Sequence, residues 1–417
     1  MTSLSGPLSH RGQTQGTKFG HGGAVHTPGT TAAAHIRSSI SSTPLSLLLK
    51  CWEDRLGKGR SPGSVRPPCH SAGILRWYGA SMYDCSKNLL KFYRAEVAID
   101  SATRTLLRDH RKTNETRLKD GLADQGRPKV KRFQVQGGYA MHTVVQHPKN
   151  DYDIDNGVIF EAADLIGSQG AAMSALDVRK MVRDAVDDGS FKTAPEVRTN
   201  CVRVHYEAGH HVDLPVYREK QNLFGTTYLE LAGADWKKSD PASVNDWFEG
   251  KVTNRSPDNS DDLQMRRIVA YLKALGKSRD SWNAPTGFMF SILVVECYVP
   301  DQRDDVSLVK TLRKIRDRLD NSLKIKHPVV DEYVTQGDAD TRTKFFRDKA
   351  PSLLSNLSVL DGSDCDAAKA ASAWDAFFRT TYFTDRIKES AAAIGITGIV
   401  SSSSPIRSIR DGERRYG

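Results

Sequence analysis

Apolar residues occupy every second position in two short segments near the middle of the chain. The set comprises Val202, Val204 and Tyr206, followed after Ala208-Gly209 by Val212, Leu214 and Val216. Side chains two residues apart project from the same face of an extended chain. The pattern therefore predicts two short strands joined by a turn, with one side of each strand buried and Asp213 on the other side.

Helical spacing of apolar residues precedes and follows these strands. A charged, helix-prone segment runs from Lys87 to about Gly121, and Ser174 begins a second helix that ends at Gly189. Beyond about Ala234 the helical segments are Pro241 to Glu249, Leu263 to Leu275, Phe288 to Tyr298, Val306 to Leu323 and Ala367 to Ala393. This order predicts an α+β fold, in which residues 82–233 form a lobe with a sheet, residues 234–397 form a helical lobe, and a cleft lies between them.

The second helix of the helical lobe has a basic face. We expect Ser260 to be its N-cap and Gly276 to end it. Arg266, Arg267 and Lys273 then make the surface beside its apolar side basic. From the spacing alone, an ordinary solvated helix face explains these charges.

Both ends of the chain lack a sustained period. Residues 1–81 are rich in Gly, Ser, Thr, Pro and His, and residues 398–417 contain a run of serines. We expect both ends to be disordered. A misassigned start codon explains the first segment, and a transit peptide is the alternative. The apolar run Leu45 to Leu49 is too brief to span a membrane, so we expect no membrane partner.

The charge balance points to a polyanionic partner. The 417 residues carry a formal net charge of +10, much of it in the tails, which fits a nucleic-acid binder or an enzyme that handles several phosphates. The chain has no long basic stripe with interleaved aromatic residues of the kind that single-strand binders use. The charge balance therefore does not decide between a nucleic acid and a small polyanionic substrate. The six cysteines are scattered and include no C-x-x-C, which argues against a disulfide scaffold and favours a reducing cytoplasm.

Three carboxylates are the candidate chemistry. Asp153 and Asp155 lie two apart in an extended segment, and Asp213 lies on a later strand. Carboxylates on neighbouring strands can hold two magnesium ions about 3.5–4 Å apart, and manganese can substitute for them. Three histidines beside Asp213 raise zinc as an alternative, but the oxygen-rich ligands favour a harder ion; they are His205, His210 and His211.

A glycine pair precedes the first carboxylates. Gly137-Gly138 allows the backbone to approach phosphate oxygens closely. Together, the segment Gly137 to Thr143, the Asp-Ile-Asp at 153–155 and His211-Val212-Asp213-Leu214-Pro215-Val216-Tyr217 resemble the nucleotidyltransferase superfamily. More narrowly, the chain from about Met82 onward resembles the bacterial cGAS/DncV-like nucleotidyltransferases of CBASS anti-phage defence. One departure is Gly138, because the family usually has a serine there that contacts the donor triphosphate.

The resemblance implies a polymerase-beta-like lobe with a mixed sheet and a set of site residues. Asp153, Asp155 and Asp213 would bind magnesium, and Asp213 is best placed to help activate the acceptor hydroxyl. The expected contacts to the donor nucleotide are Gln136, Gly137, Gly138, Lys273 and Thr286. Some family members are attached to other molecules through a C-terminal glycine by ubiquitin-transfer-like enzymes, so Gly417 is either a conjugation point or a chance ending.

The function implied by the resemblance is the synthesis of a cyclic purine dinucleotide from ATP and/or GTP, with release of pyrophosphate. The product would activate a downstream effector in anti-phage defence. A cyclic trinucleotide is the nearest variant. A non-catalytic nucleotide or RNA sensor of the same fold, and a tRNA or protein nucleotidyltransferase, are the alternatives from other classes.

Overall fold

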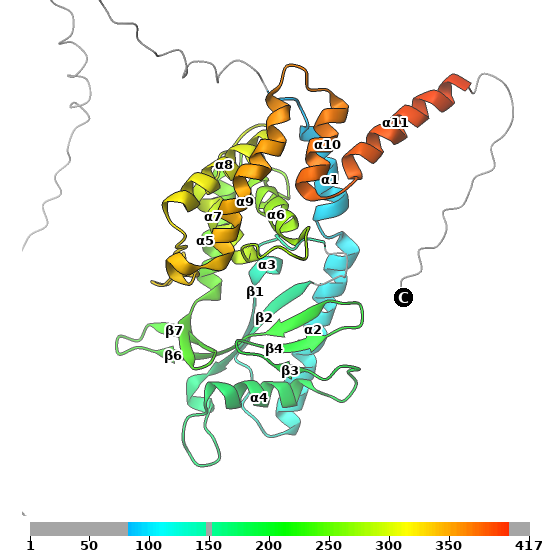
Figure 1. The fold of residues 1–417 in the computed structure, drawn as a ribbon. Helices are drawn as coiled ribbons and strands as arrows, with labels where there is room; N and C mark the ends of the chain where they lie inside the picture. The colour runs from blue at the N-terminus through cyan, green and yellow to red at the C-terminus, as the bar shows by residue number, and fades with distance from the viewer. Residues whose placement is uncertain (1–81, 147–151, 400–417) are drawn as a thin grey trace, which may run out of the picture. The chain divides into compact units, whose positions relative to one another are not determined.

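A mixed sheet with helices packed on it, and a separate group of helices, make up the computed structural model, which describes residues 82–146 and 152–399 (Figure 1). All of these residues belong to one folded unit. The expectations for residues 1–81 and for Gly417 lie outside the described residues. No helix within the described ranges is long and apolar enough to cross a membrane.

The sheet has eight strands in the order β3-β4-β5-β2-β6-β7-β8, and β1 pairs with β2. Their bounds are β1 Arg132–Gln136, β2 Asp153–Glu161, β3 Glu196–Val197, β4 Val202–His205, β5 His211–Leu214, β6 Val216–Gln221, β7 Thr227–Ala232 and β8 Trp236–Ser239. β2 is parallel to β5 and β6, and the other pairs are antiparallel. The predicted α+β class is confirmed, and β4 and β5 are the two predicted strands around Ala208-Gly209.

Some helices pack on the sheet, and the others form the second lobe. Those of the first part are α1 Ser86–Phe92, the π-helical turn η1 Tyr93–Val97, α2 Ser101–Asp124, α3 Gly137–Ala140 and α4 Ala175–Val186. The later ones are α5 Pro241–Arg255, α6 Gln264–Lys277, α7 Gly287–Cys297, α8 Asp304–Asn321, α9 Thr341–Leu357, α10 Ala367–Phe378 and α11 Tyr382–Ile399. Ser174 caps α4 as predicted, because its hydroxyl accepts the N–H of Asp177 at 3.1 Å.

The chain buries two main hydrophobic clusters. One lies between the sheet, α2 and α4, and the other joins α1 and η1 to α5 and the helices that follow it. The N-terminal helical segment, expected to belong wholly to the sheet lobe, thus contributes to both. Phe377, Phe378 and Phe383 are buried in the second cluster, so these rings pack in the core.

Two predicted helices are interrupted. The segment Lys87 to Gly121 breaks after η1, where Ala98 has extended backbone angles, and Asp100 begins α2 by accepting the N–H of Thr103 at 2.6 Å. The late segment Ala367 to Ala393 breaks at Arg379, whose φ of 56° is left-handed. Apolar spacing on both sides of each break is helical, which is why the pattern did not reveal it.

The expectation for the start and the basic face of α6 was wrong. The helix begins at Gln264, whose N–H donates to Asp258 at 2.8 Å, so Ser260 is not its N-cap. Arg266 and Arg267 are 7% and 6% exposed and both form ion pairs. Opposite charges from distant segments allow these arginines to be buried, and their partners carry no signal in the local spacing.

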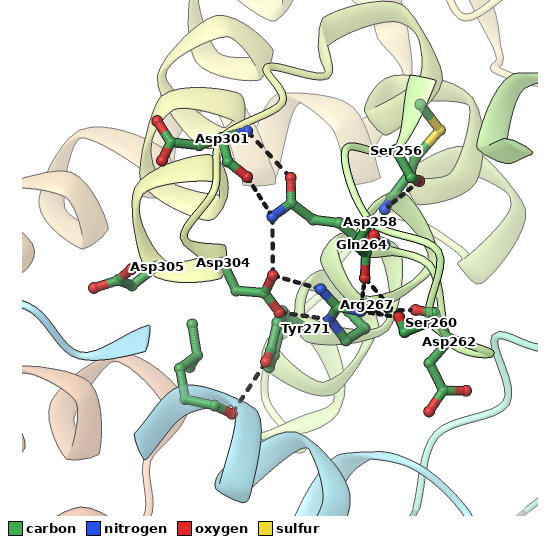
Figure 2. A network of polar contacts seen from close by, with 12 residues as sticks. Ser256, Asp258, Ser260, Asp262, Gln264, Arg267, Tyr271, Asp301, Asp304 and Asp305 are labelled. Carbon is green, nitrogen blue, oxygen red and sulfur yellow. Dashed lines mark hydrogen bonds and ion pairs between the residues drawn. The ribbon is translucent and has the colours of Figure 1, made fainter. Parts of the chain in front are cut away.

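Arg267 is the centre of a polar network between α6 and the start of α8 (Figure 2). Its guanidinium donates from Nε and Nη2 to the two carboxylate oxygens of Asp304, at 2.6 and 2.7 Å, and from Nη1 to Asp258 at 2.8 Å. The Gln264 amide also donates to Asp304, at 2.9 Å. The network therefore holds α6, which carries Lys273, in a fixed place against α8.

Replacing Asp304 by Ala should unfold the protein at a markedly lower urea concentration. The change leaves the Arg267 guanidinium buried without its main partner, a loss that costs roughly 3–5 kcal/mol in comparable buried pairs. Asp317→Ala is the matched control, because Asp317 lies on the same helix in an exposed pair with Arg316 and should shift the midpoint little. Equal shifts for the two variants would contradict this role of the network.

Candidate active site

Strand register brings the three predicted carboxylates to neighbouring positions. Along β2, Asp153 pairs with His211 and Asp155 with Asp213. Residues in register on parallel neighbours share a face of the sheet, so Asp155 and Asp213 lie side by side, and Asp153 is two residues away on the same face of β2. Asp213 is 7% exposed, whereas the Asp153 side chain is 54% exposed.

Two basic side chains contact these carboxylates. Arg203 donates from Nε and Nη2 to the two oxygens of Asp213, both at 2.7 Å, and its Nη2 lies 3.4 Å from Asp153 Oδ1. His211 Nε2 lies 2.5 Å from the same oxygen of Asp153. Burial disfavours the ionised form of Asp153, but the contacts with His211 and Arg203 outweigh it and lower the pKa.

Asp155 has the opposite electrostatic environment. Burial raises its pKa to about 7, and the negative charges of Asp213 and Asp153 add to the rise. The negative charge of the three carboxylates is only partly balanced by the basic side chains around them. Such a site suits a hard divalent cation. The oxygen donors thus fit magnesium in chemistry, although no group of three or more His, Cys, Asp or Glu residues in the described ranges is arranged as a ready-made metal cage.

Gly137 packs directly onto Asp155. Its φ is 66°, and a Cβ built on it would lie 2.0 Å from Asp155 Oδ2. Gly138 differs, because a Cβ there would meet only ordinary contacts, the nearest being Lys273 Nζ and Val144 at 3.6 Å. Position 137 therefore requires glycine, whereas position 138 has room for the serine that the family usually carries.

Lys273 points from α6 toward the glycine segment. Its Nζ donates to the hydroxyl of Thr143 at 2.7 Å and to the Thr143 carbonyl at 3.1 Å. Burial lowers its pKa to about 7, and the charge of Lys277 lowers it further, while Asp155 opposes the shift. The ammonium is thus poorly solvated and well suited to pair with an anionic ligand.

Most of the predicted residues line one cavity of about 570 Å³, a size typical of small-molecule sites. They are Gln136, Gly137, Gly138, Asp153, Asp155, Lys273 and Thr286. Asp213 is not among the lining residues; it lies beside Asp155 on the neighbouring strand, and Arg203 occupies both of its carboxylate oxygens. The Gln136 amide donates to the Tyr217 hydroxyl at 3.0 Å, and Thr286 caps α7 by accepting the N–H of Met289 at 3.3 Å.

The three histidines near Asp213 do not line this cavity. His210 is 2% exposed and its Nε2 lies 2.6 Å from Nδ1 of His110 on α2. His211 contacts Asp153, and His205 lies 3.1 Å from Glu196. These histidines have different partners, and among the described residues they form no shared zinc site.

Several cavity residues were missed by sequence reasoning. Those with polar or aromatic groups that a ligand could contact include Tyr217, Asn245, Trp282, His327 and Arg342. Asn245 donates to the Val135 carbonyl at 2.9 Å, while its buried Oδ1 has no partner within the described part of the chain. These residues come from separate segments, so no local motif could have predicted them.

Comparisons with known proteins agree with this geometry. Residues 131–217 match the family model described as the nucleotidyltransferase domain of cyclic GMP-AMP synthase DncV-like proteins. A cyclic GMP-AMP synthase of Escherichia albertii is 27% identical over 211 residues, which are 48% of this chain and 44% of that protein. The chain therefore spans less than half the length of this curated relative.

Solved structures share the fold. The Bradyrhizobium diazoefficiens CD-NTase CdnG in complex with GTP has a TM-score of 0.58 at 13% identity, covering 73% of this chain and 98% of that one. Vibrio cholerae DncV in complex with the linear intermediate 5' pppA(3',5')pG has a TM-score of 0.57 at 15% identity, covering 71% and 96%. Residues 131–217 thus resemble a DncV-like nucleotidyltransferase domain in sequence, and the chain has the fold of these solved structures.

Proposed function

We propose that this chain joins ATP and/or GTP into a cyclic oligonucleotide and releases pyrophosphate at each step. The observation that carries the proposal is the register of Asp155 with Asp213, which sets carboxylates of neighbouring strands at the edge of a cavity lined by Gly137 and Lys273. The family match over residues 131–217 and the linear intermediate bound by the similar Vibrio cholerae protein support it.

The reaction divides into binding and transfer. A ribose hydroxyl of one nucleotide attacks the α-phosphorus of another, so that a new P–O bond forms, the α–β anhydride bond breaks and pyrophosphate leaves. Lys273 and the backbone at Gly137-Gly138 would hold the triphosphate, and the carboxylates Asp153, Asp155 and Asp213 would hold two magnesium ions. Bound magnesium ions make the hydroxyl more acidic and neutralise the leaving group.

The two-step product is most simply a cyclic purine dinucleotide. The linear intermediate turns over in the same cavity, and its remaining hydroxyl attacks the other α-phosphorus to close the ring. A cyclic trinucleotide requires one more addition before closure. In this proposal the chain acts in the cytoplasm, and its product signals to an effector in anti-phage defence.

The experiment that tests the function uses the full chain with magnesium and four labelled NTPs, followed by phosphatase treatment and separation of products. A phosphatase-resistant small product that disappears when ATP or GTP is omitted is expected. Label transferred to added RNA or to protein, with no small product, would instead support a tRNA or protein nucleotidyltransferase. Nucleotide binding without any transfer would support the sensor.

Nucleotide binding at pH 8 should be accompanied by proton uptake. Because the pKa of Lys273 is about 7, this side chain is mostly neutral at pH 8, and a triphosphate placed beside it favours the ammonium form and raises the pKa. Calorimetry in two buffers of different ionisation enthalpy measures the uptake. It should vanish in Lys273→Met and persist in Lys251→Met, a change at an exposed lysine of α5. Undiminished uptake in Lys273→Met would assign the proton to another group.

A further inference from the structure

Arg203 holds Asp213 in a way that competes with a metal ion. The guanidinium donates hydrogen bonds to both carboxylate oxygens of Asp213 at 2.7 Å, and its Nη2 also lies 3.4 Å from Asp153 Oδ1. A bidentate arginine pair occupies the lone pairs that a divalent cation would use. Asp213 can therefore ligate a cation at its full strength only when Arg203 withdraws from at least one oxygen.

The fold builds this contact into the sheet. Arg203 on β4 and Asp213 on β5 are directly opposite each other in an antiparallel pair, and opposite residues place their side chains on the same face. The hydrogen bond to Asp213 raises the pKa of Arg203, so this group stays charged at every pH at which the protein is folded. Its side chain is 18% exposed, so it has a route to solvent when the pair opens.

We infer that Arg203 is a built-in counter-ion of Asp213 that a divalent cation has to displace. Its positive charge lies within hydrogen-bonding distance of two of the three carboxylates, so it lowers the affinity of the site for a cation in the absence of nucleotide. Cation binding then depends on the additional oxygens that a triphosphate brings. The inference rests on the proposed function only in assigning the carboxylates to a divalent cation.

Binding of Mn²⁺ to the full chain without nucleotide tests the inference, measured by the loss of the free-ion EPR signal. Arg203→Gln should bind Mn²⁺ roughly tenfold more tightly than the wild type, a typical size for coupling between competing ligands. Arg203→Lys keeps the charge and loses the bidentate fork, so it should fall between the two. Equal or weaker binding by Arg203→Gln, or by Arg203→Lys if the first variant does not fold, overturns the inference.

Two further variants locate the effect. Adding Asp213→Asn to Arg203→Gln should remove the gain in Mn²⁺ affinity, because the freed carboxylate is lost. Arg218→Gln is the matched control, since Arg218 lies on β6 and pairs with Glu230; it should leave Mn²⁺ affinity unchanged. A gain of the same size in Arg218→Gln would show a general charge effect and contradict the inference.

Thermal unfolding separates this role from a structural one. In EDTA, Arg203→Gln should melt below the wild type, because Asp213 loses its partner, and saturating Mn²⁺ should raise its Tm by more than it raises that of the wild type. A purely structural arginine would lower Tm equally under both conditions. Neither measurement requires turnover, so a protein that makes no product could still support the inference, and an active one could still refute it.

Discussion

Asp155→Asn should abolish product formation and yet leave the protein at least as stable as the wild type. Asparagine keeps the shape of the side chain and removes the charge that a divalent cation needs, so we expect turnover to fall by a factor on the order of a thousand or more. The same change relieves the repulsion among the three carboxylates that raises the pKa of Asp155 to about 7.

The pH dependence of stability shows that removing the Asp155 charge should stabilise the folded protein. The folded pKa lies above the ordinary value of 3.8, so between about pH 4 and 7 the folded protein binds more protons than the unfolded chain, and stability falls as the pH rises through that window. Asparagine does not titrate, so Asp155→Asn should melt above the wild type at pH 8 in EDTA.

The control for this variant is Asp164→Asn, which removes an exposed carboxylate just after β2. It should keep full activity and show no stabilisation at pH 8. Substantial activity in Asp155→Asn would contradict the assignment of this carboxylate to catalysis. A lower Tm than the wild type in EDTA would contradict the repulsion on which the argument rests.

Gly137→Ala should be far more damaging than Gly138→Ala, although the two glycines are adjacent. At position 137 the new methyl group would overlap the Asp155 carboxylate, and the left-handed φ of 66° is unfavourable for alanine by about 1–2 kcal/mol. Asp155 must move, so we expect activity to fall by roughly a hundredfold or more, since small misplacements of reacting groups carry costs of that size.

Gly138→Ala is the matched control, because a Cβ there lies 3.6 Å from its nearest neighbours and φ is not left-handed. We expect it to fold and to keep most of its activity. Steady-state kinetics and urea unfolding of the two variants make the comparison. Similar losses of activity in both variants would show that the segment tolerates no side chain at either position. The contact between Gly137 and Asp155 would then not be the reason for the glycine at 137.

The fold class and the order of the main elements could be predicted because each depends on local pattern. Alternation over Val202 to Val216 correctly predicted extended chain, and β4 has the expected half-buried pattern. The expectation of one exposed side was wrong for β5, which is buried on both faces, and Val216 begins the separate strand β6. The breaks at Ala98 and Arg379 were missed because the apolar spacing is helical on both sides of each. The local cap at Asp100, which accepts the N–H of Thr103, was the one signal that marked the first break.

The site was predictable in part for the same reason. The spacing of two residues between Asp153 and Asp155 predicted that they share one face of a strand. The register with β5 then places Asp213 beside them. Arg203 gave no such signal, although it is directly opposite Asp213 on the neighbouring strand. Arg266 and Arg267 show the reverse error. They were expected to be exposed because they are charged, but ion pairs with carboxylates from other segments allow both side chains to be buried.

The measurement that tests the central claim most directly is the ratio of pyrophosphate released to phosphatase-resistant product formed by the full chain with magnesium, ATP and GTP, together with the mass of that product. We expect two pyrophosphates per molecule of a product with the mass of a cyclic purine dinucleotide, and neither signal in Asp155→Asn. Pyrophosphate release with label retained on a macromolecule, or a phosphatase-resistant product that Asp155→Asn still makes, would contradict the account.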